Sequence, residues 1–140
     1  MIQFTVLGCP VGKGRPKFST FNGHATAYTP AKTVNYENLV KLSYQQQCGG
    51  IMYEKDVPLR AIIKAYFPIP KSTSRKKHDA MIRKEILYTK KCDADNLAKA
   101  VLDALNGIAY YDDAQVCQLI VSKMYSDEPR VEVSISEVQI

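Results

Sequence analysis

Residues that form covalent or metal cross-links are scarce in this sequence. The four cysteines lie far apart without a C-x-x-C pair, and the two histidines lack the spacing of metal ligands. With 140 residues and 46% hydrophobic side chains, the chain can bury roughly 68% of the surface that its unfolded form exposes, so a core alone can stabilise it. We therefore expect one domain over residues 1–140. Reduced thiols, as in a cytosol, are expected at Cys9, Cys48, Cys92 and Cys117.

Long apolar segments are absent as well. The apolar runs are a few residues long and are interrupted by Lys or Arg, far short of the roughly 20 residues that a transmembrane helix needs. Residues 1–7 alternate between apolar and polar side chains and lack the basic and apolar regions of a signal peptide. These absences argue against a membrane span and favour a protein that stays inside the cell.

Positive charge is modest overall but concentrated in one segment. The formal net charge is +5, yet residues 71–91 contain eight basic residues against Asp79 and Glu85. This concentration predicts a polyanionic partner. The segment's structure stays open, because a hydroxyl at 72–74 can cap a short helix, while the lack of a clean apolar stripe fits a mobile arm equally well. The eight residues are Lys71, Arg75, Lys76, Lys77, Arg83, Lys84, Lys90 and Lys91.

Alternating apolar and polar residues predict four strands. A turn is expected at 126–129 because Ser, Asp and Pro gather there. The predicted strands cover residues 2–7, 59–67, 119–125 and 131–135.

Two helices are also predicted. The first begins after Thr29-Pro30, where the hydroxyl would cap free N–H groups, and ends at Gly49-Gly50. The second follows Asp95 and ends at Asn106-Gly107, and a short extended piece is expected at 87–91. Together these elements indicate an α+β domain with a mixed sheet of about four strands against two or three helices. Core positions on the first helix are Tyr36, Leu39, Val40 and Tyr44.

A glycine- and proline-bearing loop at 8–16 follows the first strand. Its GCPVGKGRPK sequence is a poor phosphate loop, because only three residues separate Gly8 from Gly12-Lys13 and Gly14 replaces the metal-binding hydroxyl. Two interpretations remain for its basic residues: contacts to DNA phosphates, or a solvated loop. The residues concerned are Lys13, Arg15 and Lys17.

Helical phasing divides the segment after Asp95 into two faces. Leu97, Val101, Ala104 and Leu105 share one face, and polar residues line the opposite side. In extended backbone, residues two apart point the same way, so the carboxylates of Asp93-Ala94-Asp95 can converge. The polar side consists of Asp95, Lys99 and Asn106, with Asp103 nearby.

Two explanations fit these acidic residues. One aspartate can cap the helix while Lys99 pairs with Asp95, which requires no chemistry. Alternatively, a cation can offset the repulsion among Asp93, Asp95 and the second acidic pair, Asp112-Asp113. Mg²⁺ suits this second arrangement because it favours oxygen ligands. Spacing alone leaves both explanations open.

The stretch from Asp93 to Val116 resembles the RusA family of Holliday-junction resolvases. The motifs are D-x-D-N-L-x-K, then L-D-A-L-N-G, then D-D-A-Q-V, in the order that the family uses. Weaker support comes from G-K-G-R-P near the N-terminus and from Tyr28-Thr29-Pro30. The resemblance implies a homodimeric endonuclease that cuts four-way DNA junctions symmetrically with Mg²⁺ or Mn²⁺, in a bacterial or phage-infected cytoplasm.

Carried over residue by residue, the resemblance assigns roles in an active site. Asp93, Asp95 and Asp113 match the metal-binding carboxylates, Lys99 matches the active-site lysine, and Asp112 matches a supporting position. Cys92 stands where relatives often have proline or arginine, so Lys90 and Lys91 are the candidates for the DNA contact made there. The full set of expected DNA-binding residues is Lys13, Arg15, Lys17, Arg75, Lys76, Lys77, Lys90 and Lys91.

Two other functions compete with this interpretation. A nucleic-acid-binding module would use the basic residues without the acidic cluster. A metal-dependent nucleotide pyrophosphatase would use the acidic cluster on free triphosphates. Tyr110 and Tyr111 beside the acidic pair can either stack on bases or pack in the core.

Overall fold

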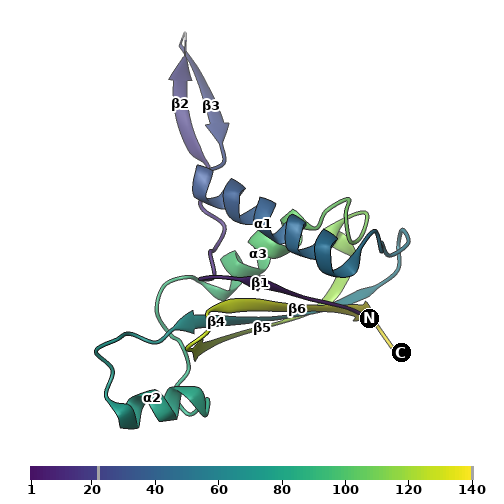
Figure 1. Cartoon of the computed structure of the whole chain (residues 1–140). Coiled ribbons are helices and arrows are strands. Elements are labelled where there is room, and N and C mark those ends of the chain that lie inside the picture. The colour runs from purple at the N-terminus through teal and green to yellow at the C-terminus, as the bar shows by residue number, and fades with distance from the viewer. Residues whose placement is uncertain (22, 140) are drawn as a thin grey trace.

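A mixed four-stranded sheet runs through the body of the protein (Figure 1). The computed structural model describes residues 1–21 and 23–139. The strand order is β1-β6-β4-β5, in which only the β4/β5 pair is parallel. This arrangement confirms the predicted α+β fold and mixed sheet. The strands are β1 (Ile2–Leu7), β4 (Leu59–Pro68), β5 (Val116–Ser126) and β6 (Arg130–Glu137).

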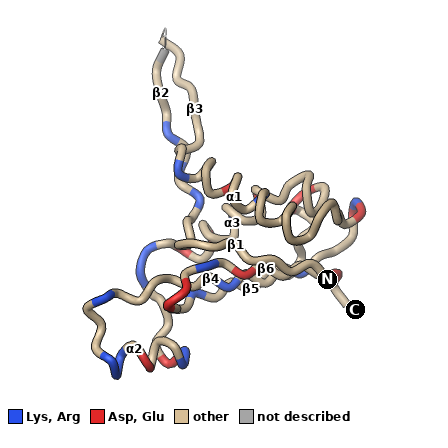
Figure 2. Tube along the Cα trace, in the orientation of Figure 1, with Lys and Arg blue, Asp and Glu red and all other residues tan. Residues whose placement is uncertain are grey.

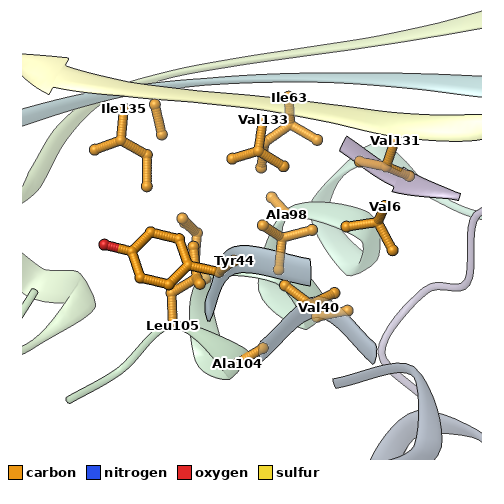
Figure 3. Packing of buried hydrophobic residues seen from close by; sticks show 14 of the residues in the cluster. Val6, Val40, Tyr44, Ile63, Ala98, Ala104, Leu105, Val131, Val133 and Ile135 are labelled. Carbon is orange, nitrogen blue, oxygen red and sulfur yellow. The ribbon is translucent and has the colours of Figure 1, made fainter. Parts of the chain in front are cut away.

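Two helices, α1 (Ala31–Cys48) and α3 (Ala94–Ala104), cover one face of the sheet (Figure 1). Alternate side chains of β1, β4 and β6 point toward these helices and form the core (Figure 3). Val6, Ile63 and Val131 lie in this layer and are fully buried. In the described part of the chain, no helix combines the length and apolar character that a membrane crossing requires.

Helix α1 follows the prediction except at two positions. Tyr36, Val40 and Tyr44 are buried as predicted, but Leu39 is 40% exposed. At about 100° per residue, Leu39 lies roughly 90° from the centre of the buried stripe, where the small residues Thr33 and Ser43 complete the packing. The predicted cap by Thr29 is also wrong. Pro30 occupies the N-cap position, and no side chain in the described residues caps the helix.

The basic segment 71–91 contains a helix rather than a mobile arm. Helix α2 (Arg75–Ile82) is capped by Ser74, whose hydroxyl accepts a hydrogen bond from the Lys77 N–H at 3.3 Å. His78 Nε2 lies 2.8 Å from a carboxylate oxygen of Asp127, in the turn between β5 and β6. This contact fastens α2 to the end of the sheet.

The short extended piece predicted at 87–91 does not become a strand of the described sheet, although the Tyr88 N–H donates to the Lys123 carbonyl on β5 at 3.4 Å. It forms an irregular strap over residues 87–92. The Tyr88 ring stacks on Phe67 with centroids 3.7 Å apart, and Lys123 Nζ on β5 donates hydrogen bonds to the carbonyls of Lys90 (3.1 Å) and Cys92 (3.0 Å). The backbone and the side chain of Lys123 on β5 therefore both hold this strap.

A separate hairpin, which the sequence analysis did not predict, projects from the body of the protein (Figure 1). It consists of β2 (Lys17–Phe21) and β3 (His24–Tyr28), paired antiparallel. All five residues of β3 are exposed. The printed sequence carries the expected signal, because Asn22-Gly23 between two alternating segments is typical of a tight hairpin turn.

Candidate active site at helix α3

The start of α3 presents two carboxylates to solvent. Leu97, Val101 and Leu105 are fully buried on the opposite face, as helical phasing predicts, and they fix the orientation of the helix. Asp93 is the N-cap residue, but its carboxylate makes no capping hydrogen bond within the described residues. Asp93 and Asp95 are both exposed. Capping therefore does not account for these acids.

Lys99 also lies on this exposed face, one turn after Asp95. No ion pair joins the two side chains among the residues that the structure describes, although i, i+4 spacing permits one. The ammonium group is therefore available to a bound anion. Helical phasing predicted Asp95 and Lys99 on this face. The extended backbone predicted for Asp93-Ala94-Asp95 is wrong, because α3 begins at Ala94 and includes Asp95 in its first turn.

The strap before α3 positions Asp93. Cys92 has a φ of 102°, in the left-handed region that costs a non-glycine residue roughly 1–3 kcal/mol. The hydrogen bonds from Lys123 hold the carbonyls on both sides of Lys91 and offset this cost. Lys123 is a residue that sequence reasoning missed, because nothing in the local pattern links β5 to the strap.

The glycine-bearing loop is bonded to the first turn of α3 and to α1. The Lys13 N–H donates to the Asn96 carbonyl at 2.9 Å, and the Gly14 N–H donates to Thr33 Oγ1 at 2.8 Å. Gly12 has no room for a side chain, because a Cβ there would lie 2.7 Å from the Cys92 sulfur and 3.2 Å from Asn96 Cβ. These close contacts explain the glycines without a phosphate loop.

Lys13 is engaged inside the protein. Its Nζ lies 3.0 Å from Glu37 on α1 and 3.1 Å from Asp103 on α3. Burial lowers the pKa of Lys13, but the hydrogen bonds that its ammonium donates to Glu37 and Asp103 outweigh burial, so the net pKa is raised. The predicted phosphate contact by Lys13 must therefore compete with two carboxylates.

The second acidic pair lies beyond the other end of α3, at the 3₁₀ turn η1 (Asp113–Gln115). Asp112 Oδ1 accepts a hydrogen bond from the Ala114 N–H at 3.1 Å. This bond is the largest cause that lowers the pKa of Asp112, and a side-chain hydrogen bond with Asp113 is the next. Asn106 Oδ1 accepts the Asp113 N–H at 2.8 Å. Asp112 and Asn106 thus hold the turn that carries Asp113.

The Asp113 carboxyl lies close to other acids. Burial is the largest cause that raises the pKa of Asp113, and the neighbouring carboxylates of Asp112 and Asp103 raise this pKa further. Asp103 is in the last turn of α3, whereas Asp95 is in the first turn. Eight residues separate them, which is about 12 Å along a helix. Asp113 therefore belongs to the far end of the polar face.

The predicted three-carboxylate metal site is not formed within one chain. No group of three His, Cys, Asp or Glu side chains suited to a metal ion occurs in residues 1–21 and 23–139. Asp93 and Asp95 stand at the start of α3, and Asp113 stands near its end. The length of α3 separates these two positions, and the assignment of all three carboxylates to one ion stays a prediction.

The two tyrosines beside the acidic pair differ in environment. Tyr110 is fully buried and its hydroxyl donates to the Leu102 carbonyl, so it packs in the core and cannot stack on a base. Tyr111 is 57% exposed. Of the two, only Tyr111 keeps a ring face for a ligand.

Basic residues gather near the start of α3 and along α2 (Figure 2). A groove of about 550 Å³ lies between the glycine-bearing loop, the strap and the first turn of α3. Lys17, Lys32 and Lys91 line it together with Asn96 and the Tyr88 ring. All of the predicted DNA-contact residues except Lys13 are exposed, namely Arg15, Lys17, Arg75, Lys76, Lys77, Lys90 and Lys91.

Comparison with known proteins identifies a family for this chain. Residues 8–136 match the family model described as Endodeoxyribonuclease RusA. The chain is 43% identical over 139 residues to the uncharacterized protein YqaN of Bacillus subtilis (strain 168), covering 98% of this chain and 96% of YqaN. It is 31% identical over 137 residues to the crossover junction endodeoxyribonuclease rusA of Lactococcus phage r1t, covering 97% and 96% of the two chains.

Proposed function

Since the chain belongs to the RusA family of endodeoxyribonucleases, we propose that it resolves four-way DNA junctions by paired, symmetric hydrolysis of phosphodiester bonds. The observation that carries the proposal is the exposed pair Asp93 and Asp95 at the start of α3, next to a groove lined by lysines. The relative from Lactococcus phage r1t, named for crossover junctions, supports the choice of substrate. The enzyme would serve DNA recombination and repair in the cytoplasm of a bacterium that carries or is infected by a phage.

The proposed reaction is attack of water on phosphorus with cleavage of the bond to the 3′ oxygen. Asp93, Asp95 and Lys99 are the residues proposed to act directly. The lysine either offsets charge on the phosphoryl oxygens or orients the attacking water. Arg75, Lys76 and the other exposed basic residues would bind the junction arms through phosphates, giving an affinity that falls with salt.

A divalent cation, Mg²⁺ with Mn²⁺ as a substitute, is part of the proposal. Such an ion polarises a phosphoryl oxygen and lowers the pKa of a bound water. Asp93 and Asp95 supply carboxylates of the required type. Asp113 is proposed as a third ligand, but its position at the far end of α3 means that a rearrangement or a different assembly must bring it closer.

A homodimer completes the proposal. A four-way junction presents two symmetry-related strands, so a C₂ dimer with one site per subunit would cut both and leave nicked duplexes. Such a dimer also contains two copies of every carboxylate described above.

One assay tests the proposed function. The protein is incubated with a labelled synthetic four-way junction, with linear duplex and with free nucleoside triphosphates, each with Mg²⁺ and with EDTA. We expect paired symmetric nicks in the junction alone, dependent on metal and lost in Asp95→Asn. Asp56→Asn is the matched control, because Asp56 is exposed and its positive φ is one that asparagine tolerates.

The other outcomes identify the competing functions. Junction binding without cleavage, unchanged in Asp95→Asn, would identify a binding module. Hydrolysis of triphosphates with intact junctions would identify a nucleotide pyrophosphatase. Either result refutes the proposed resolvase.

A further inference from the structure

The β2–β3 hairpin exposes a large aromatic side chain to solvent. Phe18 is 74% exposed, on an element that projects from the body of the protein (Figure 1). A phenyl ring in that position forgoes the free energy that burial would supply. It contributes nothing visible to the core, and the sheet is complete without the hairpin.

One face of the hairpin suits contact with a flat ring. Phe18 pairs with Ala27, and the next pair on the same face is Thr20 with Ala25. Small neighbours on the facing strand leave the Phe18 ring accessible from above. The opposite face carries the Lys17–Tyr28 pair, which combines a positive charge with a second aromatic ring.

Charge near the hairpin favours a polyanion. The first 36 residues contain no Asp or Glu, and the first acidic residue in the sequence is Glu37. The same stretch contains four basic residues, Lys13, Arg15, Lys17 and Lys32. With Lys13 held by carboxylates, the other three remain exposed around the root of the hairpin.

The groove connects the hairpin to the candidate active site. Lys17, the first residue of β2, lines the groove, and so does Asn96 in the first turn of α3. Asp95 is the neighbour of Asn96 in the chain. A nucleic acid strand that leaves the hairpin can therefore follow lysine side chains to the exposed carboxylates.

We propose that the hairpin senses the branch point of DNA: Phe18 stacks on a base exposed at the centre of the junction, and Lys17, Lys32 and Lys91 lead the strand to Asp93 and Asp95. This inference rests on the proposed function, since it assumes junction DNA as substrate. It explains how a protein that binds phosphates distinguishes a branch from a continuous duplex, where no base is free to stack.

A second copy of the chain is the competing occupant of the hairpin face. Four side chains form a face far smaller than the roughly 800 Å² per partner that stable interfaces need. Two hairpins of like charge would also repel each other. Both arguments favour DNA.

Binding measurements test the stacking contact. Fluorescence anisotropy in EDTA compares a labelled four-way junction with a duplex of the same arm sequence. We expect Phe18→Ala to weaken junction binding by roughly 5- to 150-fold, the usual effect of losing one aromatic–base stack, and to leave duplex binding unchanged. Phe18→Tyr should restore junction binding. Leu42→Ala is the matched control, because Leu42 is 50% exposed on α1 and does not line the groove.

The lysines of the groove require a different readout. Lys17→Ala should weaken junction and duplex binding alike and reduce the slope of log affinity against log salt by about one. Lys55→Ala is its control, because Lys55 is exposed but does not line the groove. Equal slopes for Lys17→Ala and Lys55→Ala would remove Lys17 from the proposed path.

A direct probe is available because the chain has no tryptophan. Phe18→Trp places a single indole on the hairpin, and Leu42→Trp places one on α1. Stacking predicts that junction DNA quenches the emission of the Phe18→Trp protein only, and duplex DNA quenches neither.

Three results would overturn the inference. If wild-type protein cuts junctions and Phe18→Ala binds and cuts them equally well, the hairpin proposal fails while the proposed function stands. If Phe18→Ala converts a dimer to a monomer in sedimentation without changing junction affinity per site, the hairpin contacts a second copy. If wild-type protein neither binds nor cuts junctions, the proposed function fails and the inference fails with it.

Discussion

Replacing Lys13 with methionine tests whether an ion-pair bridge fastens the glycine-bearing loop to both helices. The Lys13 ammonium lies between Glu37 and Asp103 at 3.0 and 3.1 Å, and the three side chains are 19%, 15% and 23% exposed. Methionine keeps most of the aliphatic packing and removes the charge. Two partly buried carboxylates on different helices then lose their shared partner.

The magnitude follows from these distances and exposures. Each charge-assisted hydrogen bond contributes about 1 kcal/mol after a discount for solvent screening, and the unpaired carboxylates add a smaller desolvation cost. We expect Lys13→Met to lower the free energy of unfolding by roughly 2–3 kcal/mol. For a chain of this length the unfolding entropy is about 0.3 kcal/mol/K, so the melting temperature should fall by about 7–10 °C.

Thermal unfolding followed by circular dichroism measures this change. The raised pKa of Lys13 gives a second readout, because a lysine whose pKa rises on folding stabilises the fold below its unfolded pKa of 10.5. The difference between wild type and variant should therefore be constant from neutral pH to about pH 9 and shrink as pH rises through the folded pKa.

A matched variant separates charge from packing. Lys13→Met combined with Glu37→Gln and Asp103→Asn should recover part of the loss, because neutral amides have no charge to neutralise. A melting temperature of Lys13→Met within about 2 °C of wild type would show that the bridge contributes no net stability, as many exposed ion pairs do not.

Two further predictions concern the strap and helix α2. Lys123→Met removes the hydrogen bonds that hold the strap before Asp93. Single-turnover junction cleavage should therefore slow by roughly tenfold or more, while junction affinity changes less. An equal loss of cleavage rate and affinity would assign Lys123 to DNA binding instead. The contact with Asp127 outweighs desolvation and raises the pKa of His78, so this interaction is present below the ordinary pKa of 6.5 and is lost as pH rises through the folded value. His78→Gln should therefore lower the melting temperature at pH 5.5 but not at pH 8.5, and a pH-independent difference would contradict the assignment.

The core elements could be predicted because their patterns are set by burial. Alternation in β1, β4 and β6 matches a sheet with one face against helices, and the phase of α3 puts Leu97 and Val101 in the core as predicted. Leu39 shows the limit of this reasoning. Its apolar character fitted the stripe, but tertiary packing placed Thr33 and Ser43 there instead.

The hairpin and the bridge at Lys13 escaped prediction for different reasons. The hairpin has a local signal in Asn22-Gly23, but its aromatic residues Phe18 and Tyr28 are exposed and make no core, so burial does not set its pattern. The bridge has no local signal, because Lys13 and Asp103 lie 90 positions apart and meet only when the loop packs on α3.

The positions of the acidic residues show most clearly what the sequence alone does not determine. The motif predicts which carboxylates matter, and α3 then sets how far apart they stand. The apolar face of α3 is buried in the core, so the helix cannot bend to bring Asp95 to Asp113 without exposing Leu97 or Leu105. The turn that carries Asp113 is in turn held by Asn106 at 2.8 Å. Any ion shared by the three carboxylates must therefore come with movement of η1 or with groups from outside the chain. Asn106→Ala removes the hydrogen bond that holds η1. This variant therefore separates the effect of the position of η1 on metal affinity from the effect of the Asp113 carboxylate itself.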